Sequence, residues 1–70
     1  MTKLPQVSHA RVIRALERRG FYILRKGKHV AMTDGRSLVI IPRQRSIKPG
    51  TLRQILDAIN MTVEEFKDLL

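Results

Sequence analysis

The sequence of 70 residues predicts an α+β fold in which a helix, three short strands and a second helix follow one another along the chain. Two observations lead to this prediction. Apolar residues recur with a helical period near both ends of the chain, whereas the middle holds short runs of branched and aromatic residues separated by glycine turns. A meander of strands flanked by helices is typical of the α+β class.

Residues 8–20 carry helix signals at both ends. Ser8 is suited to cap the N-terminus, and Gly20 is suited to the left-handed conformation that ends a helix. Two apolar pairs have the spacing of the contacts that accompany such ends: Val7 with Val12, and Leu16 with Phe21. The sequence therefore predicts the first helix here.

The first helix also presents a basic face. Arg11, Arg14 and Arg18 fall on the side opposite the apolar residues of this segment. Such a stripe either contacts phosphate groups or is simply solvated, and the spacing alone favours neither reading.

Three runs of strand-forming residues follow, at 21–25, 29–33 and 37–41. Lys26, Gly27 and Lys28 separate the first two runs. Asp34 and Gly35 separate the second pair and form the dipeptide preferred in a two-residue type I′ hairpin turn. Consecutive hairpins predict a three-stranded antiparallel sheet.

The remainder of the chain predicts a loop and two helices. Pro42 should end the third strand, and residues 43–48 form a polar, basic loop. Pro49 suits the first turn of the second helix, which Asn60 ends. The capping-box sequence at 62–65 begins a short C-terminal helix, with Met61 spaced to contact Phe66.

Both main helices are expected on one face of the sheet, which leaves the other face open. In the second strand, alternation then directs Val30 and Met32 toward the helices and His29 and Ala31 to the open face. The third strand is apolar on both sides, Leu38 with Ile40 and Val39 with Ile41, so either choice leaves an apolar pair beside His29. That patch is either a protein-binding surface or is covered by the terminal helix or a loop.

Charge and composition narrow the function. The formal net charge of +8 favours a polyanionic partner, nucleic acid first, although basic residues also serve solubility. The chain has no cysteine, which excludes disulfides and thiolate chemistry and favours a cytoplasmic location. No segment approaches the roughly 20 apolar residues that span a bilayer. Residues 1–70 are expected to form one domain.

His29 is the candidate catalytic residue, because His9 lies in a helix first turn where a histidine is usually only exposed. His29 follows the basic turn at Lys26, Gly27 and Lys28, where a phosphate could approach the backbone closely. A neutral imidazole there could take a proton from a ribose 2′-hydroxyl, and flanking cations favour the neutral form. This chemistry needs no cofactor, and the carboxylates show no spacing for a divalent ion. A lone histidine is otherwise commonly structural.

The whole chain resembles the HicA toxins of toxin–antitoxin modules. The resemblance is carried by these pieces: Leu4-Pro5, Arg19-Gly20-Phe21, Gly27-Lys28-His29, Asp34-Gly35-Arg36, Ile41-Pro42, Lys48-Pro49-Gly50-Thr51-Leu52 and Ile55-Leu56. It implies a double-stranded-RNA-binding-like fold, metal-independent endonuclease activity on mRNA, and neutralisation by a HicB-type antitoxin. His29 takes the place of the family's catalytic histidine. Lys28 replaces the small residue common in relatives, and Arg43-Gln44 stands where many relatives have a second histidine.

The resulting hypothesis is an RNA-cleaving toxin with His29 as general acid or base. Residues expected to contact RNA or phosphate are Lys26, Gly27, Lys28, Arg36, Arg43, Arg45 and Lys48. Residues expected to contact the antitoxin are His29, Ala31, Val39 and Ile41. Lys28 and Tyr22 are candidates for a second proton-transfer group. The alternatives are a non-catalytic RNA-binding module using the same basic face, and an interaction protein whose basic surface meets an acidic partner.

Overall fold

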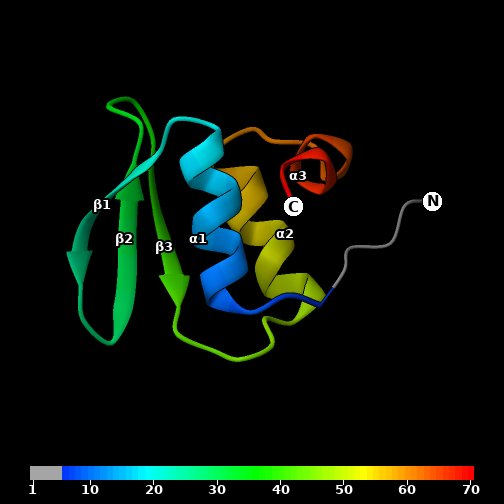
Figure 1. Cartoon of the computed structure of the whole chain (residues 1–70), viewed down its shortest axis with the longest axis horizontal. Helices are drawn as coiled ribbons and strands as arrows, with labels where there is room; N and C mark the ends of the chain where they lie inside the picture. The colour runs from blue at the N-terminus through cyan, green and yellow to red at the C-terminus, as the bar shows by residue number, and fades with distance from the viewer. Residues whose placement is uncertain (1–5) are drawn as a thin grey trace.

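The computed structural model describes residues 6–70, whose elements follow one another in the predicted order. Their bounds are α1 His9–Arg18, β1 Tyr22–Lys26, β2 His29–Thr33, β3 Leu38–Pro42, α2 Pro49–Ala58 and α3 Val63–Leu69. The strands form one antiparallel sheet in the order β1-β2-β3. The helices lie on one side of this sheet (Figure 1). The predicted α+β class is confirmed, while Leu4-Pro5 lies outside the described residues.

Both ends of α1 form as the sequence predicts. The Ser8 hydroxyl accepts a hydrogen bond from the Arg11 backbone N–H at 3.3 Å. At the other end Gly20 has a φ of 102°, and the Phe21 N–H donates to the Leu16 carbonyl at 3.0 Å. This is the Schellman arrangement, in which a left-handed residue lets the chain turn back and satisfy free helix carbonyls.

The end of α2 repeats this arrangement with a different residue. Asn60 has a φ of 55°, and the Met61 N–H donates to the Leu56 carbonyl at 3.0 Å. Asparagine tolerates the left-handed region better than other residues with a side chain, because its amide forms local hydrogen bonds. Asn60 therefore ends α2, as predicted.

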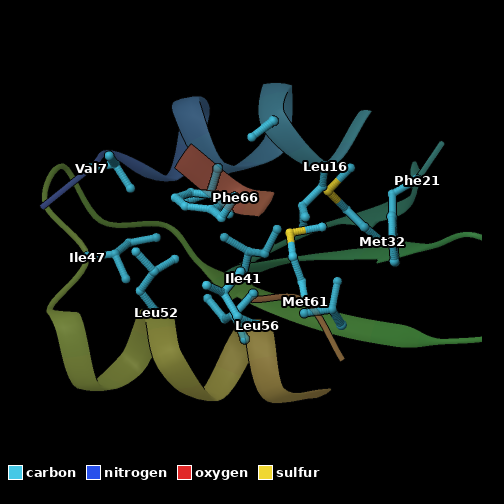
Figure 2. Packing of buried hydrophobic residues seen from close by; sticks show 14 of the residues in the cluster. Val7, Leu16, Phe21, Met32, Ile41, Ile47, Leu52, Leu56, Met61 and Phe66 are labelled. Atoms are coloured by element: carbon cyan, nitrogen blue, oxygen red, sulfur yellow. The ribbon is translucent and has the colours of Figure 1, made fainter. Parts of the chain in front are cut away.

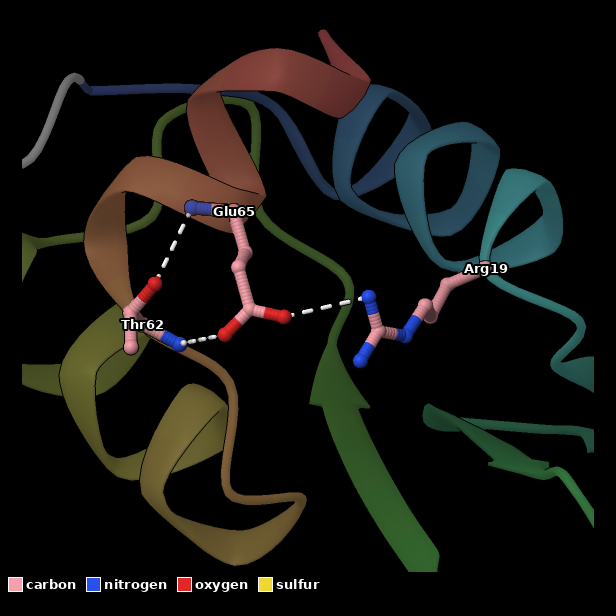
Figure 3. A network of polar contacts seen from close by, with 3 residues as sticks. All are labelled: Arg19, Thr62 and Glu65. Carbon is pink, nitrogen blue, oxygen red and sulfur yellow. Dashed lines mark hydrogen bonds and ion pairs between the residues drawn. The ribbon is translucent and has the colours of Figure 1, made fainter.

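A capping box begins α3 and ties it to α1. The Thr62 hydroxyl accepts from the Glu65 N–H, and a Glu65 carboxylate oxygen accepts from the Thr62 N–H, both at 3.1 Å (Figure 3). The second Glu65 oxygen lies 3.1 Å from the Arg19 guanidinium. The backbone and hydroxyl of Thr62, followed by Arg19, lower the pKa of Glu65.

The core fills the space between the sheet and the three helices (Figure 2). Phe66 of α3 is fully buried there together with Leu16 of α1 and Leu52 of α2. The structure adds one core residue from the segment 43–48, which was predicted to be a polar loop. Ile47 is fully buried, and its N–H donates to the Val7 carbonyl at 2.7 Å in an isolated antiparallel bridge.

The prediction of a two-residue type I′ turn at Asp34 and Gly35 is wrong. Thr33 pairs with Leu38, so four residues, 34–37, connect β2 and β3. A type I′ turn needs positive φ at both central residues, but here Gly35 alone has it, at 95°. The Asp34 carboxylate instead accepts from the backbone N–H groups of Ser37 and Arg36, at 2.8 and 2.9 Å, which lowers its pKa. Strand β3 accordingly lies one residue later than the predicted 37–41, and β1 also lies one residue later than the predicted 21–25.

The assignment of faces is confirmed for β2 and corrected for β3. Val30 and Met32 are buried under the helices, as predicted. The antiparallel register pairs Val39 with Met32 and Ile41 with Val30, and directly paired residues share a face. Val39 and Ile41 are therefore buried, at 2% and 0% exposure, so they do not lie on the open face, where the predicted antitoxin contact requires them.

Leu38 and Ile40, the other apolar pair of β3, lie on the open face instead. Leu38 and Ile40 are 58% and 49% exposed on the open face, paired with Thr33 and Ala31. Tyr22, paired with Thr33 from β1, is 52% exposed. The open face thus carries an uncovered apolar patch, as predicted, but β3 contributes different residues to it.

Candidate functional site

His29 is the first residue of β2 and is exposed at one end of the sheet. Its partner in β3 is Pro42, the last residue of that strand. Because β3 runs antiparallel to β2, the chain leaves β3 at the same end of the sheet where His29 lies. The loop at 43–48 and the turn between β1 and β2 therefore meet around this histidine, at the bottom of Figure 1. We call this the His29 end.

Hydrogen bonds hold the turn before His29 in place. The Gly27 N–H donates to the His29 carbonyl at 3.1 Å. The Arg43 guanidinium reaches across from the end of β3 and donates to the Gly27 carbonyl at 3.3 Å. Arg43 thus links the loop after β3 to the turn that precedes His29, and it adds a cation to the site.

The beginning of α1 is joined to the same end. The backbone N–H of His9 donates to the Gln44 carbonyl at 3.0 Å, and its Nδ1 lies 3.0 Å from the same oxygen. His9 is half-buried and serves as a structural tether between α1 and the loop at 43–48. The sequence did not predict this contact, because the two residues are 35 positions apart.

The charges of the molecule are divided between its two ends. The carboxylates of Glu17 and Asp57 lie toward the C-terminal ends of α1 and α2, and both helices begin near the His29 end. Asp34 lies in the loop at the opposite end of the sheet. The remaining carboxylates belong to α3, which Arg18 and Arg19 hold to the C-terminal end of α1. The His29 end therefore carries cations with no carboxylate among them, a field that attracts phosphate.

A β-bulge brings one further cation to the open face. The register between β1 and β2 shifts between Ile23 and Arg25, so Arg25 pairs with Ala31. Ala31 shares the open face with His29, and Arg25 therefore lies on that face, one diagonal position from the histidine. Regular alternation would have directed Arg25 toward the helices with Ile23. The bulge has no sequence signal, and the sequence alone did not identify Arg25.

The structure brings most of the predicted phosphate-binding residues together. Lys26, Gly27 and Lys28 form the turn beside His29, and Arg43 is bonded to it. Arg45 and Lys48 lie farther along the loop that begins at the same end, and both are exposed.

Two predicted residues lie elsewhere. Arg36 belongs to the loop at 34–37, at the opposite end of β2 from His29, a separation of about 13 Å along the strand. Tyr22 pairs with Thr33 at that same far end. Neither residue is placed to act on a group held at His29, so Tyr22 does not fit the role of a second proton-transfer group.

The described residues offer no cluster of three or more histidine or carboxylate side chains that could hold a metal ion. Within residues 6–70, each helix is too short or too polar to cross a membrane.

These features define a small, basic α+β protein with an open sheet face and an exposed histidine among cations at one end. The sequence model of the family described as HicA toxin of bacterial toxin-antitoxin matches residues 10–61. This match covers well over half of the chain, and the chain belongs to the HicA toxin family. Comparison with curated proteins and with solved structures finds no match. The matched span ends before α3, although α3 supplies Phe66 to the core.

Proposed function

We propose that this HicA-family toxin is a metal-independent endoribonuclease that cleaves mRNA through His29 and is neutralised by a HicB-type antitoxin. The observation that carries the proposal is the exposure of His29 at an end of the molecule where the neighbouring charged groups are cations. A general base needs open access to its substrate, and a phosphodiester substrate needs positive charge beside that base. The proposal implies action in the cytoplasm, where mRNA is translated.

In the proposed reaction, the neutral His29 imidazole takes the proton of a ribose 2′-hydroxyl. The 2′-oxygen then forms a bond to the adjacent phosphorus, and the bond from phosphorus to the 5′-oxygen of the next nucleotide breaks. That 5′-oxygen takes a proton from water, and the hydroxide left behind takes the proton from the His29 imidazolium, which regenerates water and the neutral imidazole. The products are a 2′,3′-cyclic phosphate and a 5′-hydroxyl. DNA lacks the 2′-hydroxyl and would be bound without being cut.

The cations of the turn have a separate role in this proposal. Lys26 and Lys28 flank Gly27, whose lack of a side chain lets a phosphate approach the backbone. Positive charge there stabilises the additional negative charge that develops on the phosphate oxygens during attack. Arg43 contributes charge and also holds the turn through the Gly27 carbonyl.

The antitoxin is proposed to cover His29 and the open face of the sheet, blocking RNA by steric exclusion. The exposed apolar side chains of Leu38 and Ile40 support this part of the proposal, because such patches on small proteins commonly mark protein-binding surfaces. Ala31, half-buried between them and the histidine, belongs to the same surface.

The test is cleavage of a long single-stranded RNA by the purified chain in the presence of a chelator. His29→Ala is expected to lower the rate by about 10²- to 10⁴-fold, the usual contribution of a general acid or base, with RNA affinity retained. The matched control is His9→Ala, which removes the structural histidine and should leave cleavage in place. Cleavage by His29→Ala at the rate of the unmodified chain would rule out the mechanism. Intact RNA with a gel shift in all lanes would instead indicate a non-catalytic RNA-binding module.

A further inference from the structure

The outer edge of β3 is less protected than most exposed sheet edges, because Pro42 at its end is the one residue of the strand that blunts it. Proteins usually blunt an edge strand with charged side chains, a bulge or a covering segment. Strand β1, the other edge of this sheet, has two of these features: a bulge after Ile23 and the charged side chains of Arg25 and Lys26. Strand β3 has a regular register with β2 and no charged residue between Leu38 and Pro42.

The backbone of β3 is also free on its outer side. Among residues 6–70, the one hydrogen bond that reaches 38–42 from outside the β2 ladder is the local turn bond from the Gln44 N–H to the Pro42 carbonyl, at 3.0 Å. The outward N–H and C=O groups of the strand before Pro42 are therefore available to a further strand.

A groove of about 280 Å³ runs beside this edge, between β3 and α2. One wall is formed by Leu38 and Ile40, and the other by Thr51, Gln54 and Ala58 of α2. These helix positions recur at three- and four-residue spacing and so form one stripe along α2. The stripe is made of small or uncharged side chains, which leave room for the side chains of an added strand.

The chemistry of the groove favours one kind of occupant. Its walls hold no cation, so they offer nothing to an RNA phosphate. Two copies of this chain carry a net charge of +8 each, and their mutual repulsion opposes self-association. Arg36 lies in the exposed loop that precedes β3, whereas the Arg43 guanidinium is bonded to the Gly27 carbonyl on the β1–β2 side of the sheet. The complementary segment is extended and apolar, with an acidic residue at the end that meets Arg36.

We propose that β3 is a docking strand: an extended segment of the antitoxin pairs with its outer edge, inserts apolar side chains between β3 and α2, and meets Arg36 with an acidic end. The inference rests on the proposed function for the identity of the partner. It extends the open-face contact, with which it shares Leu38 and Ile40, to the outer edge of β3 and the groove beside α2, and it gives Arg36 a role at the end of the molecule remote from His29.

The first test is Ala58→Phe, which fills the groove from the helix side without altering β3. Its matched control is Ala10→Phe, the same change at an exposed position of α1. The HicB-type antitoxin, purified separately, is titrated against each full-length variant. The expected result is at least a tenfold loss of affinity for Ala58→Phe and little change for Ala10→Phe. Equal affinity of both variants overturns the proposal, provided that their circular dichroism spectra match that of the unmodified chain.

A second pair of variants tests the acidic end. Arg36→Glu should weaken antitoxin binding several-fold and flatten its salt dependence, whereas Arg53→Glu, on α2 outside the groove, should have a smaller effect. Hydrogen exchange tests the same contact on the unmodified chain, so it does not depend on whether a variant folds. The outward amides of residues 38–41 should exchange rapidly in the free chain and slowly in the complex, and unchanged exchange there overturns the proposal.

RNA cleavage by the same variants separates this inference from the proposed function. Loss of antitoxin affinity in Ala58→Phe with no cleavage by any variant would sustain the docking strand and contradict the nuclease. A gel shift of RNA that Ala58→Phe alone abolishes would assign the groove to RNA and overturn the inference. A dimer of the unmodified chain that Ala58→Phe dissociates would assign it to a second copy and also overturn it.

Discussion

The two ends of this molecule are held together in different ways. At the end remote from His29, local motifs satisfy the backbone: the Schellman turn at Gly20, the Asp34 loop, and the capping box between Thr62 and Glu65. At the His29 end, long-range hydrogen bonds join the local ones: His9 of α1 donates to Gln44, and Arg43 donates to Gly27.

The two ends therefore have different roles, one in stability and the other in binding. Local motifs fix the backbone independently of the surroundings, and they consume the hydrogen-bonding capacity of the side chains involved, including Asp34 and Glu65. The His29 end leaves its lysines exposed and unpaired with carboxylates, as a site for a polyanion requires. Changes at the remote end should therefore affect stability first, and changes at the His29 end should affect RNA first.

The largest effect on stability is expected from Phe66→Ala in α3. This side chain is fully buried among α1, α2 and the sheet, so its removal should lower the free energy of unfolding by about 3 to 5 kcal/mol. Urea unfolding measures the change, with the exposed Lys67→Ala as control. A loss below about 1 kcal/mol would mean that α3 is dispensable to the core.

Two glycine substitutions compare the ends directly. Gly20→Ala forces a side chain into a φ of 102°, which should cost about 1 to 2 kcal/mol although nothing lies within 4 Å of the added carbon. Gly27 lacks a positive φ, and its added carbon would lie 3.9 Å from the His29 carbonyl, an ordinary contact. Gly27→Ala should leave the urea midpoint nearly unchanged while slowing RNA cleavage, because the methyl group occupies the proposed phosphate approach. Equal destabilisation by both would contradict the division between the ends.

A pair of arginine substitutions makes the same comparison for RNA. Arg43→Ala should weaken RNA binding and reduce the slope of its salt dependence by about one counterion. Arg36→Ala, at the remote end, should leave that slope as it is in the unmodified chain. Filter binding over a range of salt concentrations gives both values. A smaller slope of salt dependence for Arg36→Ala than for Arg43→Ala would place the RNA path at the end remote from His29, contrary to the proposal.

The smallest expected effect is on the stability of the fold at acidic pH. The pKa values of Asp34 and Glu65 are lower in the folded chain than their ordinary values, so the unfolded chain binds these protons at higher pH. Their contribution to stability is thus present above the unfolded pKa values, near 4, and is lost as pH falls through the folded ones. Glu65→Gln should reduce the slope of melting temperature against pH below about pH 4.5. An identical slope would show that the carboxylate contributes nothing measurable.

Much of the fold followed from local rules. Ser8, Gly20, Asn60 and Thr62 mark helix ends in the structure as they did in the sequence, since each acts on a backbone group within a few positions of itself. The Asp34-Gly35 turn was mispredicted for a related reason: the same aspartate that favours a tight turn also favours a longer loop in which it accepts two backbone hydrogen bonds.

The sequence by itself determined the element order, the helix ends, the charge and the selection of His29 as the candidate catalytic residue, because these depend on residue type and short spacing. Only the tertiary structure decided which side of β3 is buried, since Val39 with Ile41 and Leu38 with Ile40 are equally apolar and the register with β2 makes the choice. It also decided the face of Arg25, through a bulge, and the separation of Arg36 from His29, through strand direction. Each of these depends on pairing between segments, which a local pattern does not encode.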